Sequence, residues 1–218
     1  LVEEKNARIL EEEIAKWDKI FKRELRASDE NVSVKTERLD SHEGKVFNPS
    51  TVQKAIGLLE CIPNGVHTMS MEIDDLTESS MNLGVVNTTE EAVVYEGLIR
   101  SNLETLKNNI LNQCRILAEM VGADFESFSD YPGWEYNPDS ELLSKISKLY
   151  KKMYDRELEI IATHGGVECG IFKGKMPNLD MVGIGPNAID VHTPNEHLDI
   201  ESTGKAWDFM LALLKEMK

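Results

Sequence analysis

Two short clusters hold most of the residues that could carry chemistry in this sequence. They are Thr163-His164-Gly165-Gly166-Val167-Glu168-Cys169-Gly170 and Gly185-Pro186-Asn187-Ala188-Ile189-Asp190-Val191-His192-Thr193-Pro194-Asn195-Glu196. The glycines of the first cluster allow tight turns and a close approach of the backbone to a ligand, and Glu168 adds a carboxylate. In the second cluster, His192 is an imidazole on a constrained loop, which suits a zinc ligand.

Both clusters also have an ordinary structural interpretation. A single histidine on a loop is usually a surface residue. A carboxylate at the start of a helix, such as Glu168, favours the helix dipole, and Cys169 is more often a small buried residue than a nucleophile. A zinc hydrolase needs three or more protein ligands for each metal and a base for the water. The sequence has no HExxH and no His-x-Asp followed by a Glu-Glu pair, so the residues alone leave both interpretations open.

The elements around these clusters are predicted to be strands and helices in alternation. Apolar segments at 158–162 and 181–184 predict strands, and the clusters follow them. Ligands of α/β sheets bind at the carboxyl ends of strands. A helix is predicted to start at Asn137-Pro138, and the last helix covers 202–217. The alternation predicts an α/β arrangement with parallel strands.

The first 130 residues predict a small sheet that helices cover on one side, an α+β layer. Periodic apolar residues predict three helices, over 2–26, from Asn48-Pro49 to Pro63-Asn64-Gly65, and over 103–121. Pro49 starts the second helix, and Gly122 is the C-cap of the third. Strands are predicted at 31–36, 82–86 and 92–99, the last two joined by a turn at 87–90. The aromatic and proline-rich segment 131–138 predicts a boundary between domains 1–130 and 131–218.

Composition excludes several classes of function. The net charge of −15 argues against binding nucleic acid through a basic surface. No run of about 18 apolar residues exists to cross a membrane. The three cysteines are odd in number and have no paired spacing, which indicates reduced thiols and a cytoplasmic protein.

Several of these motifs closely resemble the C-terminal part of bacterial aminoacyl-histidine dipeptidases, cytosolic non-specific dipeptidases related to carnosinase. The resemblance rests on Tyr131-Pro132-Gly133-Trp134, on the stretch from His164 to Gly170, and on His192-Thr193-Pro194-Asn195-Glu196. The earlier segments 63–66 and 78–84 and Arg100-Ser101 are also similar to that family. The similarity covers nearly the whole chain.

The resemblance implies a fold and a set of site residues. Residues 1–130 are expected to form the second half of a lid domain, and 131–218 the C-terminal part of a zinc-peptidase-like α/β catalytic domain. His192 is expected to bind one of two bridged zinc ions, and Glu168 to meet the amino terminus of the substrate. Arg100 is expected to hold the substrate carboxylate through a bidentate fork, and Asn82 lies in a matching lid segment as a further substrate-binding residue.

The resemblance also implies what this sequence lacks. The other metal ligands, the bridging Asp and the general-base Glu are expected in an N-terminal half that is absent here, so no catalytic residue is predicted and the chain alone is expected to be inactive. The whole protein is then predicted to hydrolyse Xaa-His and other dipeptides through a metal-bound hydroxide. Two alternatives are a related amidohydrolase, such as a deacylase or desuccinylase, and a non-catalytic module that binds or dimerises through a sheet edge, giving a homodimer.

Overall fold

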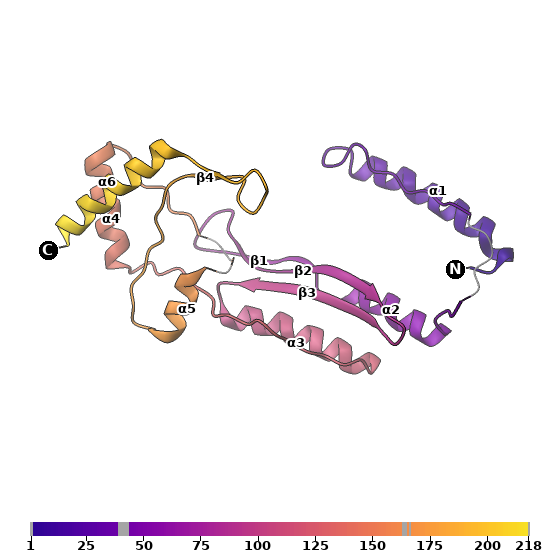
Figure 1. The fold of residues 1–218 in the computed structure, drawn as a ribbon. Helices are drawn as coiled ribbons and strands as arrows, with labels where there is room; N and C mark the ends of the chain where they lie inside the picture. The colour runs from indigo at the N-terminus through magenta and orange to yellow at the C-terminus, as the bar shows by residue number, and fades with distance from the viewer. Residues whose placement is uncertain (1, 39–43, 163–164, 166, 218) are drawn as a thin grey trace. The chain divides into compact units, whose positions relative to one another are not determined.

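The chain forms two compact units, Leu1–Lys54 and Ala55–Lys218. A computed structural model describes residues 2–38, 44–162, 165 and 167–217 (Figure 1). Part of the first chemical cluster, including His164, lies outside the described residues. The boundary expected between residues 130 and 131 stays a prediction.

The first unit is built on one helix. A short 3-10 turn, Glu4–Asn6, leads into α1 (Ala7–Glu24), which confirms the helix predicted over 2–26. The strand predicted at 31–36 is not formed, and that prediction is wrong. The Val34 N–H donates instead to the Asp18 carboxylate of α1 at 3.0 Å. A strand needs a neighbouring strand to take up its backbone groups, and here a helix side chain takes up one of them.

Helix α2 (Pro49–Cys61) starts as the sequence predicts. The Asn48 Oδ1 accepts a hydrogen bond from the Thr51 N–H at 2.9 Å, which satisfies one of the free donors of the first helical turn. Proline at the first helical position needs no donor. The helix ends just before Pro63-Asn64-Gly65, and Gly65 has the positive φ of 93° that glycine tolerates.

The second unit contains a three-stranded antiparallel sheet. It consists of β1 (Gly65–Met69), β2 (Thr77–Thr88) and β3 (Val93–Ser101), in the order β1-β2-β3. The two strands predicted at 82–86 and 92–99 are confirmed as parts of β2 and β3, while β1 was not predicted. The hairpin turn is closed by a hydrogen bond from the Thr89 N–H to the Ala92 carbonyl at 2.9 Å.

Helix α3 (Glu104–Val121) runs beside the sheet, in contact with β2 and β3 (Figure 1). Ile110 of α3 is 2% exposed, and Cys114 Sγ lies 3.5 Å from Met81 Sδ of β2. Burial raises the pKa of the Cys114 thiol. Gly122 ends the helix with φ at 68°, as a left-handed C-cap. These contacts confirm a layer with a helix packed on one face of the sheet.

Among the described residues, the C-terminal part of the second unit consists of three helices and a short ribbon joined by long irregular segments. It contains α4 (Glu141–Tyr154), α5 (Glu168–Lys175), a two-stranded ribbon of β4 (Ala188–Ile189) and β5 (His197–Leu198), and α6 (Ile200–Glu216). Its core joins α4 to α6 through four buried side chains, Ile146, Leu149, Phe209 and Leu213. The mixed helix-and-sheet fold class is thereby confirmed.

Helix α4 starts three residues later than its predicted Asn-Pro cap. Ser140 is the N-cap, and its hydroxyl accepts from the Leu143 N–H at 2.9 Å. The Asp180 carboxylate, 40 residues away in sequence, accepts from the Ser140 hydroxyl at 2.7 Å and from the Leu142 N–H at 2.9 Å. A cap donated from a distant loop leaves no signal in the local sequence.

The two parallel strands predicted at 158–162 and 181–184 are not formed, and those predictions are wrong. Leu158 and Val182 instead pack against the α4–α6 core, while Ile161 is 82% exposed. Parallel strands need a partner that is distant in sequence, and no described strand lies beside these two segments. The clusters therefore follow irregular segments rather than strand ends.

Candidate functional site

His192 lies in the exposed loop between β4 and β5. Its φ is 65°, and that of Asp190 is 53°, so two non-glycine residues take the left-handed conformation. The loop is held by its own polar groups: the Thr193 hydroxyl donates to the Asp190 carbonyl at 2.8 Å. The His192 N–H donates to the Glu196 carboxylate at 3.0 Å. No role is predicted for Glu196 from the sequence. The sequence feature that could have indicated this hydrogen bond is a carboxylate four positions after the histidine.

Glu168 is the first residue of α5 and is exposed. Its carboxylate is therefore at the helix end that favours negative charge, as the ordinary interpretation of this residue holds. The preceding cap residue, Val167, has no side-chain acceptor. The glycine two residues further on, Gly170, is buried against Pro132.

Arg100 and Asn82 are brought together on one face of the sheet. Arg100 of β3 pairs with Ser80 of β2, and Asn82 lies two residues from Ser80. Side chains two residues apart on a strand share a face, so Arg100 and Asn82 are diagonal neighbours. Both are exposed, and this face is opposite to the one that Met81 turns toward α3. Among the described residues, Arg100 has no ion pair.

The segment that leads out of the sheet layer is anchored by Lys107 of α3. Its ammonium binds Asp130 at 2.6 Å and Glu104 at 2.9 Å, and it donates to the Tyr131 carbonyl at 2.9 Å. Its side chain is only 12% exposed. Burial alone would lower the pKa of Lys107, but the hydrogen bonds that its ammonium donates to Asp130 and Glu104 outweigh burial and raise that pKa.

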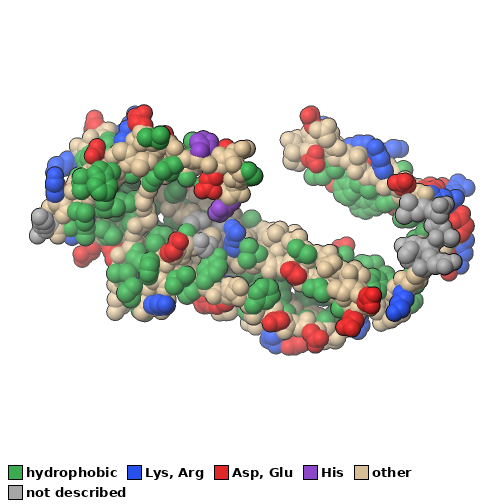
Figure 2. All heavy atoms as spheres, in the orientation of Figure 1, with side chains coloured by type: hydrophobic (Ala, Val, Ile, Leu, Met, Phe, Trp, Pro, Cys, Tyr) green, Lys and Arg blue, Asp and Glu red, His purple; other side chains and the backbone are tan. Residues whose placement is uncertain are grey.

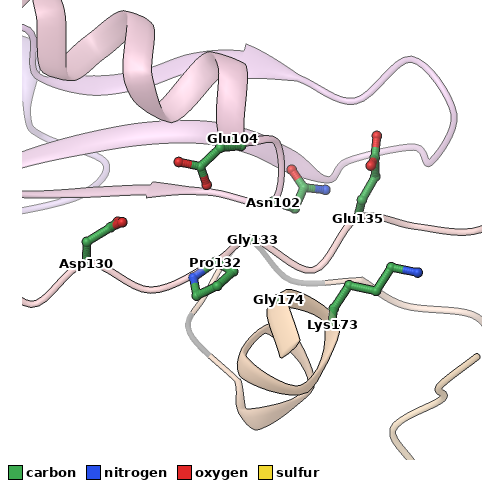
Figure 3. Close-up of a pocket in the computed structure, with 8 residues that line it drawn as sticks. All are labelled: Asn102, Glu104, Asp130, Pro132, Gly133, Glu135, Lys173 and Gly174. Atoms are coloured by element: carbon green, nitrogen blue, oxygen red, sulfur yellow. The ribbon is translucent and has the colours of Figure 1, made fainter. Parts of the chain in front are cut away.

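A surface pocket of about 410 Å³ lies at the same place (Figure 3). Its lining residues come from the start of α3, the connecting segment and α5; they are Asn102, Glu104, Asp130, Pro132, Gly133, Glu135, Lys173 and Gly174. None of the four predicted site residues lines it. Asn102 Oδ1 is buried and has no hydrogen-bond partner among the described residues.

The described residues do not complete a metal site. They contain no group of three or more His, Cys, Asp or Glu side chains able to hold a metal ion. His192 is exposed and supplies one imidazole, whereas a catalytic zinc needs three protein ligands. No hydrogen bond or ion pair between described residues joins His192 to Glu168, Arg100 or Asn82. In addition, no described helix is long and apolar enough to span a membrane.

The chain is a mixed α/β protein whose candidate substrate-binding groups lie on three elements, β2, β3 and α5. The model of the peptidase family M20/M25/M40 matches residues 11–216. The chain therefore belongs to this peptidase family, and the family resemblance seen in the motifs is confirmed.

Similar proteins of known name agree with this assignment. The cytosol non-specific dipeptidase of Escherichia coli (strain K12) is 31% identical over 209 residues, which are 96% of this chain and 43% of that protein. The crystal structure of aminoacylhistidine dipeptidase from Vibrio alginolyticus matches with a TM-score of 0.84 and 32% identity, over 97% of this chain and 43% of that one. The chain thus spans less than half the length of these relatives.

A third protein shares the fold alone. The aminopeptidase PepT from Bacillus cereus ATCC 10987 matches with a TM-score of 0.57 and 19% identity, over 76% of this chain and 44% of that one.

Proposed function

We propose that the whole protein that carries this chain is a metal-dependent dipeptidase of the cytoplasm. Residues 1–130 would belong to a lid domain and 131–218 to the C-terminal part of the catalytic domain. The proposal is supported by the family match over residues 11–216 and by the names of the two relatives near 30% identity. The structural observation that carries it is Arg100, an exposed guanidinium without an ion pair among the described residues, beside Asn82 on the open face of the sheet.

Each predicted site residue has a role in this proposal. Arg100 binds the carboxylate of a dipeptide through its planar fork, which matches a carboxylate in two hydrogen bonds. Asn82 supplies a neutral amide on the same face. Glu168 meets the ammonium at the other end of the substrate. Recognition of both charged ends restricts the substrate to short peptides, because a longer chain would move one end away from its partner.

His192 is proposed to bind one of two zinc ions, with the remaining ligands on residues outside this sequence. Bound metal ions of this kind lower the pKa of a water molecule and polarise the scissile carbonyl. The exposed imidazole and the Glu196 hydrogen bond that orients the His192 backbone are what the described residues contribute. Catalytic groups are expected elsewhere in the whole protein.

A test of this assignment is zinc content and turnover of Xaa-His dipeptides by the full-length protein. His192→Ala should lower both, while His197→Ala, five residues further on, serves as the matched control and should change neither. Unchanged zinc content and turnover in His192→Ala would contradict the assignment.

The substrate groups are tested by comparing Arg100→Ala with Arg115→Ala, a control on the outer side of α3. A hydrogen bond to a charged group contributes about 1.5–3 kcal/mol, so Arg100→Ala should raise the KM for dipeptides about 10- to 150-fold. Arg115→Ala should leave KM unchanged. An unchanged KM in Arg100→Ala would show that Arg100 does not bind the substrate.

Free and N-acetylated dipeptides separate this function from a deacylase or desuccinylase. An acylated substrate has no ammonium to meet Glu168, so a dipeptidase should prefer the free peptide and lose that preference in Glu168→Gln. A preference for the acylated peptide would favour the related amidohydrolase instead. The third possibility, a module that forms a homodimer through the sheet edge, predicts a dimer in size-exclusion chromatography with light scattering.

A further inference from the structure

We infer that Gly133 and Gly170 are positioning residues that fix the substrate-binding elements of Arg100 and Glu168 relative to each other. This inference rests on the proposed function, because it concerns the distance between the two groups that would bind the ends of a dipeptide. It also explains what sets that distance. Pro132 and Gly133 lie in close contact with the end of β3 on one side and with α5 on the other (Figure 3).

The first contact joins Gly133 to the end of β3. A Cβ at position 133 would lie 2.3 Å from the Asn102 carbonyl oxygen and 2.6 Å from its carbon. Asn102 is 7% exposed and follows Arg100 by two residues. The Asn102 atoms in the way belong to the backbone and not to a movable side chain, so only glycine allows these two segments of the chain to approach so closely.

The second contact joins Pro132 to α5. A Cβ at position 170 would lie 2.4 Å from the Pro132 carbonyl oxygen, and one at position 174 would lie 2.7 Å from Pro132 Cγ. Both glycines belong to α5, one turn apart, so that helix rests on Pro132 through its glycine face. Gly170 follows Glu168 by two residues in the same helix.

Neighbouring residues hold Pro132 and Gly133 in place. Lys107 binds Asp130 and the Tyr131 carbonyl, immediately before Pro132. At the end of β3, the Ser101 hydroxyl donates to the Glu78 carbonyl at 2.9 Å and accepts from the Leu103 N–H at 3.1 Å. Close backbone contacts at Gly133 and Gly170 therefore connect the end of β3, which carries Arg100, to α5, which carries Glu168.

The expected effect follows from these distances. A methyl group at 133 or 170 must move its neighbour by about 1 Å to reach ordinary van der Waals contact near 3.5 Å. A misplacement of about 1 Å can cost about 100-fold in rate. Interactions that bind the substrate and the transition state alike act on KM. The loss in kcat/KM of about 10- to 100-fold should therefore appear mainly in KM.

The experiment compares Gly133→Ala and Gly170→Ala with Gly57→Ala and Gly204→Ala in the full-length protein. A Cβ at 57 or 204 would meet nothing within 4 Å among the described atoms, so these variants control for the substitution itself. The readouts are KM and kcat for a free dipeptide, with thermal melting to measure the folded fraction. A rise in KM for the first pair only is expected.

A double-mutant cycle distinguishes positioning from a loss of stability. Glu168→Gln should raise KM strongly in the parent protein and much less in the Gly170→Ala background, because α5 has already moved there. A purely structural role would lower the folded fraction and kcat and leave the effect of Glu168→Gln unchanged. That additive result, or a KM within twofold of the parent for both glycine variants, would overturn the inference.

A milder variant covers the case in which these two fail to fold. Gly174→Ala meets ring atoms of Pro132 rather than a carbonyl, with Cγ at 2.7 Å, and should raise KM about two- to fivefold, a small fraction of the loss for a full 1 Å shift. An unchanged KM in folded Gly174→Ala would count against the inference. If Arg100→Ala and Glu168→Gln themselves leave KM unchanged, the proposed site is wrong. If they raise KM and the glycine variants do not, only the positioning role is wrong.

Discussion

The sheet layer and the C-terminal part of this chain differ in whether their predicted strands find partners. In the sheet layer, β2 and β3 are neighbours in sequence and pair through a tight turn, and α3 follows at once to cover Met81. In the C-terminal part, α4 and α6 form a core, but the two segments predicted as strands, 158–162 and 181–184, do not pair with any described strand. Figure 2 shows hydrophobic side chains at the surface over this region.

The reason for the difference is the separation of the partners in sequence. An antiparallel hairpin satisfies its backbone groups within a few residues, whereas a parallel strand needs a partner across a long connection. Exposed apolar side chains occur in both regions: Met71 and Phe128 of the first are 101% and 74% exposed, and Ile161 and Ile200 of the second are 82% and 87% exposed. The two regions therefore differ in strand pairing and not in apolar exposure.

The largest effect is expected in the C-terminal core. Phe209 is 7% exposed and packs edge-on against Tyr150, with ring centroids 5.9 Å apart. Phe209→Ala should lower the free energy of unfolding by about 3–5 kcal/mol, measured by urea denaturation. Phe128→Ala, at a position 74% exposed, is the control and should change it little. Hydrogen exchange of β2 and β3 should stay slow in Phe209→Ala; fast exchange there would mean that the two regions unfold together.

The sheet layer should show a somewhat smaller effect at its own core. Ile110→Ala removes a side chain that is 2% exposed between α3 and the sheet, and should cost about 2–4 kcal/mol. Ile116 lies on the same helix and is 47% exposed, so Ile116→Ala is the matched control. Here hydrogen exchange should accelerate in β2 and β3 and not in α4. The opposite pattern would show that the layer depends on the C-terminal part.

The link between the regions is tested at Lys107. Lys107→Met leaves the Tyr131 carbonyl without its donor and should cost about 1–3 kcal/mol. Because the pKa of Lys107 is raised in the folded state, its contribution is complete below the unfolded value near 10.4. It is lost as the pH rises through the folded value. Lys205→Met, on the exposed face of α6, should cost much less, and an equal loss in both variants would contradict an anchoring role.

The smallest effect is expected at the distant cap of α4. Asp180→Ala should cost about 1 kcal/mol, as other lost N-caps do. Hydrogen bonds from the Leu142 N–H and the Ser140 hydroxyl lower the pKa of Asp180. Its contribution is therefore present above the unfolded value near 3.9 and lost as the pH falls through the lower folded value. Asp208→Ala on α6 is the control; equal acid sensitivity in the two variants would show that the cap is unimportant.

The sequence by itself determined most of the helices, the β2–β3 hairpin and the family. Apolar periodicity gave α1, α3 and α6 nearly to their ends, because each helix satisfies its own backbone and shows its buried face every three or four residues. The β2–β3 hairpin was predictable for the same reason, since its partners are adjacent. The motifs around Glu168 and His192 pointed to a peptidase family that the family model then matched.

Only the tertiary structure decided how the candidate residues are arranged. The strand register places Arg100 beside Asn82, the Glu196 carboxylate holds the His192 backbone, and backbone contacts at Gly133 and Gly170 link β3 to α5. The structure also replaced the predicted parallel strands with segments packed on the α4–α6 core. Each of these depends on partners that are distant in sequence, and a local pattern carries no information about which distant group will meet it.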